Sequence, residues 1–181
     1  MRLLPRSSPV PSWDRVVSLS VIGLYVVPLL LAFLRQDVRQ LSPLFGMMVT
    51  VGLNETIKYH IIGTASPRPS DARDCNLWGN DGPQGGRPGA PSGHSAHVSF
   101  FAGYYLQVLS SSSSPLSSSS PLSSLFPLSA PYLPYLLVAY ALLVMLSRYT
   151  TCCHTLPQIL SGSSLGLLLS LVWYRWFPVR P

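Results

Sequence analysis

Apolar runs without charge alternate with polar connections along the chain. Residues 16–34 contain no charged side chain, and a helix of that length crosses about 30 Å of hydrocarbon. The run begins after Arg15 and exceeds the apolar length of a cleaved signal peptide, which is the alternative interpretation. Four further stretches follow at about 43–62, 95–109, 132–147 and 155–174. The pattern predicts an all-α polytopic membrane bundle of about five transmembrane helices, forming one domain over residues 1–181.

The connections between these runs differ in their chemistry. An N-terminal tail is expected over residues 1–15. The stretch at 63–93 combines Arg, acids, Gly and Pro, and we expect an active-site loop there because long connections in compact domains are usually functional. Residues 110–131 hold twelve serines and four prolines, a composition that predicts a flexible linker. The second apolar stretch carries Glu55 and Lys58, so it can cross only if those side chains face protein.

Composition supports the membrane interpretation. Hydrophobic residues make up 48% of the chain and charged residues only 10%, against roughly a quarter in an average soluble domain. So few charges argue against a soluble enzyme, and the high hydrophobicity excludes a disordered tail. The net charge is +6, but the cations are scattered between apolar runs and form no stripe that would bind nucleic acid. Eleven of the twelve cations are Arg, which favours bidentate binding of phosphate or carboxylate.

Three separated segments hold the chemically capable residues, at 58–69, 91–94 and 147–154. If all five runs cross the membrane, chain parity places these segments on one membrane face. One imidazole can attack phosphorus as the neutral ring, while a second protonates the leaving oxygen and then activates water. A phosphate dianion needs fixed cations and oriented N–H donors, which the segments supply from Lys58, Arg68, Arg148 and the turn amides around Ser92 and Gly93.

The same segments resemble the tripartite signature of the type-2 phosphatidic acid phosphatase superfamily, which consists of integral-membrane lipid phosphatases. The matching pieces are Lys58 upstream of Arg68-Pro69, then Pro-Ser-Gly-His at 91–94, then Ser-Arg-x5-His at 147–154. The resemblance implies a phosphatidic acid phosphatase/vanadium haloperoxidase-like core and hydrolysis without a cofactor or metal. It also implies a phosphohistidine at the nucleophile His154, His94 as the acid and base, and phosphate binding by Lys58, Arg68, Ser92, Gly93 and Arg148.

Two positions depart from the family pattern. Nine residues separate Lys58 from Arg68, where the family usually has six, so either Lys58 lies one helical turn deeper or His60 takes part of its role. The family normally has Asp four residues after the nucleophile, on the same helix face, whereas this chain has Gln158. Gln158 can fix the tautomer of His154 but brings no negative charge. We count it among the catalytic candidates.

The neutral side chain of Gln158 favours a substrate with a good leaving group. A diphosphate expels a better leaving group than an alkoxide, and residues 154–162 together with Asn54-Glu55 are similar to the dolichyl diphosphatase branch. That branch trims dolichyl diphosphate to the monophosphate on the lumenal side of the endoplasmic reticulum, which implies a multi-pass protein there with a lumen-facing site, if the source is eukaryotic. The expected partners are the bilayer and a lipid phosphate, and the oligomeric state is open. Alternatives are a phosphatidate or sphingoid-base phosphatase, a lipid phosphotransferase, or a catalytically impaired lipid-phosphate binder.

Other notable residues receive structural interpretations. His97 follows His94 on the same helix face, and nothing in the sequence pairs it with a role. Small residues at 162 and 166 predict a close approach between two helices. Adjacent ligands cannot easily close on one tetrahedral zinc, so Cys152-Cys153-His154 is a poor metal site. The three cysteines are badly spaced for a disulfide framework.

Overall fold

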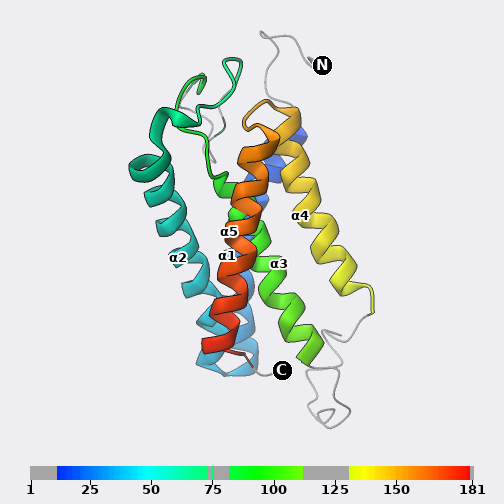
Figure 1. Ribbon diagram of the computed structural model, residues 1–181. Coiled ribbons are helices and arrows are strands. Elements are labelled where there is room, and N and C mark those ends of the chain that lie inside the picture. Colours follow the sequence, from blue (N-terminus) through cyan, green and yellow to red (C-terminus); the bar gives the residue numbers. More distant parts are fainter. Residues whose placement is uncertain (1–11, 73–74, 76–81, 112–130, 180–181) are drawn as a thin grey trace.

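The computed structural model describes residues 12–72, 75, 82–111 and 131–179. Its main elements are five α-helices that run roughly side by side (Figure 1): α1 (Ser12–Arg35), α2 (Ser42–Thr56), α3 (Gly93–Ser111), α4 (Leu133–Thr150) and α5 (Leu156–Trp176). Short helical turns, η1 (Val38–Leu41), η2 (Ile57–Ile62) and η3 (Gly63–Ala65), follow α1 and α2. The described ranges contain no strand, only a bridge between Pro67 and Pro88. The predicted all-α class is confirmed.

Helix α3 forms the centre of the bundle. It packs against α1, α2, α4 and α5, and its side chains, Phe100 and Tyr104 among them, supply much of the hydrophobic core. Figure 1 shows the start of α1, the turns after α2, the start of α3 and the connection from α4 to α5 at one end of the bundle. All three segments singled out in the sequence therefore lie at that end.

Two glycines on α5 allow it to approach α3 closely. A Cβ atom at Gly162 would lie 2.3 Å from the carbonyl oxygen of Ser92, and one at Gly166 would lie 2.1 Å from that of Ala96. No side chain fits at such distances, so the backbones meet directly, as small residues at a helix interface permit. This confirms the close approach predicted from their spacing, and it fixes the start of α3 against α5.

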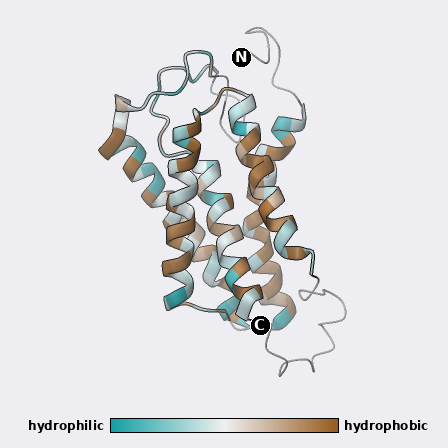
Figure 2. Cartoon of the chain, turned by 45° about the vertical axis from the view of Figure 1, so that its right-hand side comes forward, coloured by the Kyte–Doolittle hydropathy of each residue, from teal (hydrophilic) through white to brown (hydrophobic). Residues whose placement is uncertain are grey.

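Three of the five helices are long and apolar enough to cross a membrane. They are α1 over Trp13–Arg35, α4 over Leu133–Thr150 and α5 over Leu156–Trp176. Large apolar side chains are exposed along them, such as Phe33 and Leu168, and Figure 2 shows hydrophobic colour along the helices and hydrophilic loops at the site end. Such a surface is typical of a protein in a bilayer. Crossing by all five helices stays a prediction, because α2 is short and α3 is mostly covered by its neighbours.

The start of α1 corrects the predicted tail over residues 1–15. The helix begins at Ser12, four residues before the apolar run, and Asp14 in its first turn is only 3% exposed. An acidic residue is favourable there, because the helix dipole is positive at its N-terminus. The rest of the predicted tail and the Ser/Pro-rich linker fall largely on residues 1–11 and 112–130, which lie outside the described residues.

Candidate active site

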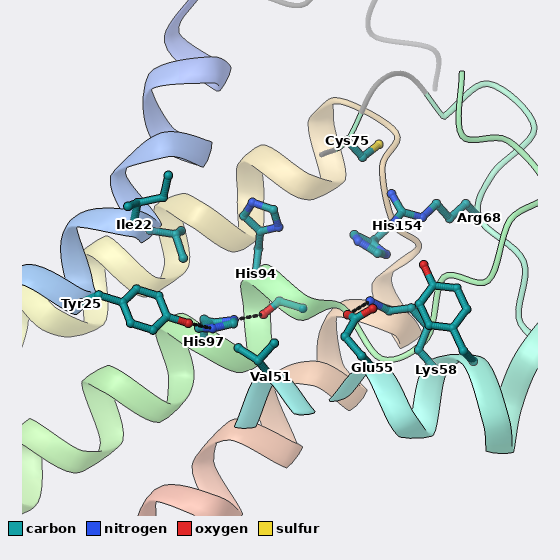
Figure 3. Close-up of a pocket in the computed structure, with 13 residues that line it drawn as sticks. Ile22, Tyr25, Val51, Glu55, Lys58, Arg68, Cys75, His94, His97 and His154 are labelled. Carbon is teal, nitrogen blue, oxygen red and sulfur yellow. Dashed lines mark hydrogen bonds and ion pairs between the residues drawn. The ribbon is translucent and has the colours of Figure 1, made fainter. Parts of the chain in front are cut away.

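A cavity of about 410 Å³ opens between α1, α2, α3 and the loops at the site end. Figure 3 shows Arg68 and His154 near one another at one side of it, and Tyr25 with His97 at the other. The lining thus combines imidazole rings and cations with apolar residues of α1 and α2. Its residues are Val21, Ile22, Tyr25, Val51, Glu55, Lys58, Tyr59, Arg68, Cys75, Gly93, His94, His97 and His154.

His154 lies in the turn between α4 and α5 and is 4% exposed. Its backbone N–H donates to the carbonyl of Arg148 at 3.2 Å, and its Nδ1 lies 3.3 Å from Oε1 of Gln158. Because a Gln oxygen can only accept, Nδ1 carries the proton and Nε2 keeps its lone pair. Burial, followed by the charges of Arg68 and Lys58, lowers the pKa of His154 to about 3, and the bond to Gln158 opposes this. The imidazole is therefore neutral near pH 7.

Gln158 connects His154 to the loop that carries Arg68. Its oxygen also accepts from the backbone N–H of Thr155 at 3.1 Å, which forms a capping interaction at the start of α5. Its amide nitrogen donates to the carbonyl of Pro67 at 2.8 Å and the hydroxyl of Ser66 at 3.2 Å. A carboxylate could not make the second set of bonds, because it has no hydrogen to donate.

Arg68 presents a guanidinium to the cavity from a loop pinned at its backbone. Its N–H donates to the carbonyl of Arg87 at 2.8 Å. Its Nε donates to the carbonyl of Pro88 at 3.4 Å. Its Nη1 is buried and has no hydrogen-bond partner among the described residues. Burial lowers the pKa of Arg68, but a guanidinium stays charged at neutral pH. A buried donor without a partner costs free energy, so this nitrogen is suited to an anionic ligand.

His94 is the second residue of α3, and its ring also faces the cavity. Its Nε2 is buried and, within the part of the chain that the structure describes, lacks a hydrogen-bond partner. The preceding turn is held by the N–H of Ser92, which donates to the backbone carbonyl of Gln158 at 2.9 Å. Gly93 lines the cavity, whereas Ser92 is fully buried and its hydroxyl accepts from Ser95 at 3.0 Å. That amide of Ser92 is therefore already used inside the protein.

Lys58 lines the cavity from the turn that extends α2. It forms an ion pair with Glu55, which also accepts from the Nδ2 of Asn54 at 3.0 Å. The additional residues between Lys58 and Arg68 are taken up by the π-helical turn η2 and the tight turn η3; a π-helical turn holds more residues than an α-helical one. Lys58 therefore reaches the cavity despite the long spacing, while His60 is exposed and is not among the described residues that line it.

Arg148 occupies a different place from the other predicted phosphate ligands. It is 1% exposed, and it is not one of the described residues that line the cavity. Its Nη2 donates to Asp14 at 2.8 Å and to Ser147 at 2.8 Å. The structure thus gives Arg148 a carboxylate partner on α1, and its role as a phosphate ligand stays a prediction.

Two features were missed by the sequence analysis. His97 has a partner after all, since its Nε2 forms a short hydrogen bond with the hydroxyl of Tyr25 and its Nδ1 lies 3.0 Å from the carbonyl of Gly93. Cys75 and Cys153 form a disulfide, which corrects the dismissal of their spacing. The spacing of the cysteines along the chain gave no signal for this bond. The bond joins the 63–93 loop to the turn that holds His154, and it removes Cys153 as a metal thiolate.

Residues 39–181 match the family model described as the PAP2 superfamily. The match covers all three segments that line or adjoin the cavity and leaves out the whole of α1. The comparisons with curated proteins and with solved structures gave no match.

Proposed function

The chain belongs to the PAP2 superfamily, and on that premise we propose that it is an integral-membrane lipid phosphatase acting through a phosphohistidine. Members of this superfamily are phosphatases, which supports hydrolysis of a phosphate ester in general. The observation that carries the proposal is the state of His154. Its Nδ1 is bound to Gln158, its pKa is depressed to about 3, and it borders a cavity that also contains Arg68 and His94.

The proposed reaction begins with attack by the Nε2 lone pair of His154 on the terminal phosphorus. The N–P bond forms as the bond from phosphorus to the leaving oxygen breaks. Arg68 and Lys58 stabilise the charge on the phosphoryl oxygens, as fixed cations do in phosphoryl transfer. The bond from Nδ1 to Gln158 holds the ring in the nucleophilic tautomer. The resulting imidazolium has no direct carboxylate partner within the described ranges of the chain, so we assign stabilisation of the transition state mainly to the cations.

His94 is assigned the proton transfers. Its buried Nε2 has no hydrogen-bond partner among the described residues, and we assign to it delivery of a proton to the leaving oxygen. The ring then takes a proton from water, and the water oxygen displaces His154 from phosphorus to release inorganic phosphate. Gly93, at the start of α3, allows the anion to approach the helix N-terminus, where N–H groups and the dipole favour negative charge.

The substrate we favour is a polyprenyl diphosphate such as dolichyl diphosphate. Gln158 supplies no negative charge to stabilise the cation that forms on His154, and a phosphate leaving group makes fewer demands on the nucleophile than an alkoxide. The lipid would approach from the bilayer with its headgroup first, against the apolar lining from Val21, Ile22 and Val51. The disulfide beside His154 supports a site that faces an oxidising compartment, such as the lumen of the endoplasmic reticulum.

A phosphate-release panel tests this proposal. Purified full-length protein is assayed with polyprenyl diphosphate, phosphatidic acid and a sphingoid-base phosphate, with EDTA present throughout. We expect release in EDTA, fastest from the diphosphate, and an acid-labile phosphoenzyme after rapid quenching. Faster release from phosphatidic acid would shift the substrate to phosphomonoesters. A phosphoenzyme that persists in His154→Ala would contradict the assigned nucleophile.

Two other functions use the same site. In a lipid phosphotransferase an alcohol resolves the phosphohistidine, and product analysis with added acceptor alcohols distinguishes it from a hydrolase. A non-catalytic binder is favoured by one observation, the neutral Gln158 beside His154. Binding of the diphosphate lipid without release of phosphate would identify that function.

A further inference from the structure

An ion pair between α1 and α4 connects a helix that lies wholly outside the family match to the candidate active site. Asp14 is 3% exposed and Arg148 is 1% exposed, and Oδ1 of Asp14 accepts from Nη2 of Arg148 at 2.8 Å. We propose that Asp14 is the positioning residue for Arg148 and thereby makes α1 part of the phosphate site. This inference rests on the proposed function.

The contacts around this pair form a closed network. Oδ1 of Asp14 also accepts from the hydroxyl of Ser147 at 2.5 Å. Nη2 of Arg148 donates to the hydroxyl of Ser18, which in turn donates to the backbone carbonyl of Asp14 at 2.8 Å. A guanidinium is planar and rigid, so bonds at Nε to Ser147 and at Nη2 to Asp14 fix its orientation. Loss of the carboxylate would leave a buried cation without its counter-charge.

The backbone of Arg148 is hydrogen-bonded to the turn that contains His154. Its carbonyl accepts from the N–H of Cys153 at 3.1 Å and from the N–H of His154 at 3.2 Å. The side chain of Arg148 is held by α1, and its main chain holds the turn on which the candidate nucleophile lies. Its positive charge also contributes to lowering the pKa of the His154 imidazole, so the guanidinium and the ring interact electrostatically.

Asp14 also sets the net charge beside the cavity. Lys58 is paired with Glu55 and Arg148 with Asp14, so the positive charge of the site falls mainly to Arg68. Removing the Asp14 charge makes the site more positive by one unit, which favours ground-state binding of phosphate. It also releases Arg148 from a fixed direction, and misplacement of a catalytic group by about 1 Å can cost roughly 100-fold in rate. The first effect lowers KM and the second lowers kcat, so the two act in opposite directions on kcat/KM.

A double-mutant cycle measures this coupling. Asp14→Asn, Arg148→Gln and the double variant are purified as full-length chains in lipid nanodiscs, and kcat, KM and the Ki of inorganic phosphate are measured. We expect Asp14→Asn to lower kcat by roughly 10- to 100-fold, while KM and the Ki of phosphate fall several-fold. In the Arg148→Gln background the same change has little effect, because the guanidinium that Asp14 positions is no longer present.

The control is Asp37→Asn at the other end of α1. Asp37 caps η1 through a bond to the N–H of Arg39 at 3.0 Å, and its substitution should leave kcat and KM unchanged. If Asp14→Asn does not fold, Asp14→Glu tests the same point, since it keeps the charge but displaces the carboxylate. In that variant kcat should fall while the Ki of phosphate stays near the wild-type value.

The proposal fails if Asp14→Asn leaves kcat and the Ki of phosphate unchanged, or if the effects of the two single substitutions are additive. A wild-type protein that releases phosphate from no lipid overturns the proposed function instead. In that case the dissociation constant of inorganic phosphate tests the coupling between Asp14 and Arg148. We expect Asp14→Asn to bind phosphate more tightly than the wild type. In the Arg148→Gln background, the same substitution should not increase phosphate affinity.

Discussion

Two buried polar regions lie side by side at the site end of the bundle, and they differ in how their hydrogen bonds are satisfied. Around Arg148 the carboxylate of Asp14 and the hydroxyls of Ser18 and Ser147 close a network inside the protein. In the cavity, Nη1 of Arg68 and Nε2 of His94 have no partner in the described part of the chain. Unpaired buried polar groups are costly. The hydrogen bonds around Arg148 are therefore suited to hold its side chain in one orientation, whereas the unpaired atoms in the cavity are suited to bind a ligand.

The largest expected effect comes from substitution of the proposed nucleophile, His154, on the cavity side. His154→Ala should lower kcat by about 10³-fold or more, because loss of the attacking group removes the covalent route. His94→Ala should have a comparable effect. Both are measured as phosphate release under single-turnover conditions, with trapping of the phosphoenzyme. His97→Ala is the matched comparison on α3, and a loss as large as that of His94→Ala would remove the distinction between the two rings.

Substituting the arginine of each region, Arg68 or Arg148, tests the difference between the two regions. Arg68→Ala should lower kcat/KM by about 10²- to 10³-fold with little change in thermal stability. Its Nη1 makes no bond among the described residues, and its Nε makes only a long bond of 3.4 Å to the carbonyl of Pro88. Arg148→Ala should cost about 3–5 kcal/mol in the free energy of unfolding, because it leaves Asp14 buried and unpaired. Denaturation in mild detergent measures the second quantity. Equal losses of stability in the two variants would show that the regions do not differ in this way.

A negative charge at position 158 should shift the pH dependence of kcat/KM to higher pH. In Gln158→Glu, a carboxylate next to Nδ1 raises the pKa of His154 from about 3, because an anion stabilises the imidazolium. Protonation blocks attack, so the acid limb of kcat/KM moves to higher pH. The carboxylate also faces the carbonyl of Pro67 where the amide donated, so we expect a loss of roughly tenfold at neutral pH.

The measurement for this variant is kcat/KM between pH 4 and pH 9, with Ser161→Ala as a control on the same helix. Absence of an acid limb above pH 4 in Gln158→Glu would contradict the assigned contact between residue 158 and His154, because the pKa of about 3 places the wild-type limb below that range. Higher activity at neutral pH would show that the loop contacts of Gln158 are dispensable.

The smallest effect is expected from the disulfide. Cys75→Ser frees the 63–93 loop from the turn that carries His154, and loss of such a cross-link lowers the free energy of unfolding by about 2–4 kcal/mol. We expect a few-fold rise in KM, because Arg68 is held by other bonds to its own loop. Steady-state assays with and without reductant measure this, and Cys152→Ser is the control. Identical reductant sensitivity in wild type and Cys75→Ser would contradict the role of the bond.

Much of the candidate site followed from local pattern. The three segments were predicted to meet because chain reversals between apolar runs place their ends together, and Lys58, Arg68, Gly93, His94 and His154 do line one cavity. The contact between His154 and Gln158 was predicted from their four-residue spacing, and it forms although His154 lies in the turn just before α5. Both predictions depend only on residues close together in the sequence and on the direction in which each apolar run crosses the bundle.

Contacts between residues far apart in the chain could not be predicted in this way. The sequence by itself determined the helical class of the described residues, the apolar helices long enough to cross a membrane, and the meeting of the three motif segments at one end, because periodicity, apolar length and motif spacing are local properties. Only the tertiary structure decided that Asp14 forms an ion pair with Arg148, that Cys75 forms a disulfide with Cys153, and that Tyr25 forms a hydrogen bond with His97. Each of these contacts joins residues more than 70 positions apart, and which partners meet is set by how whole helices pack.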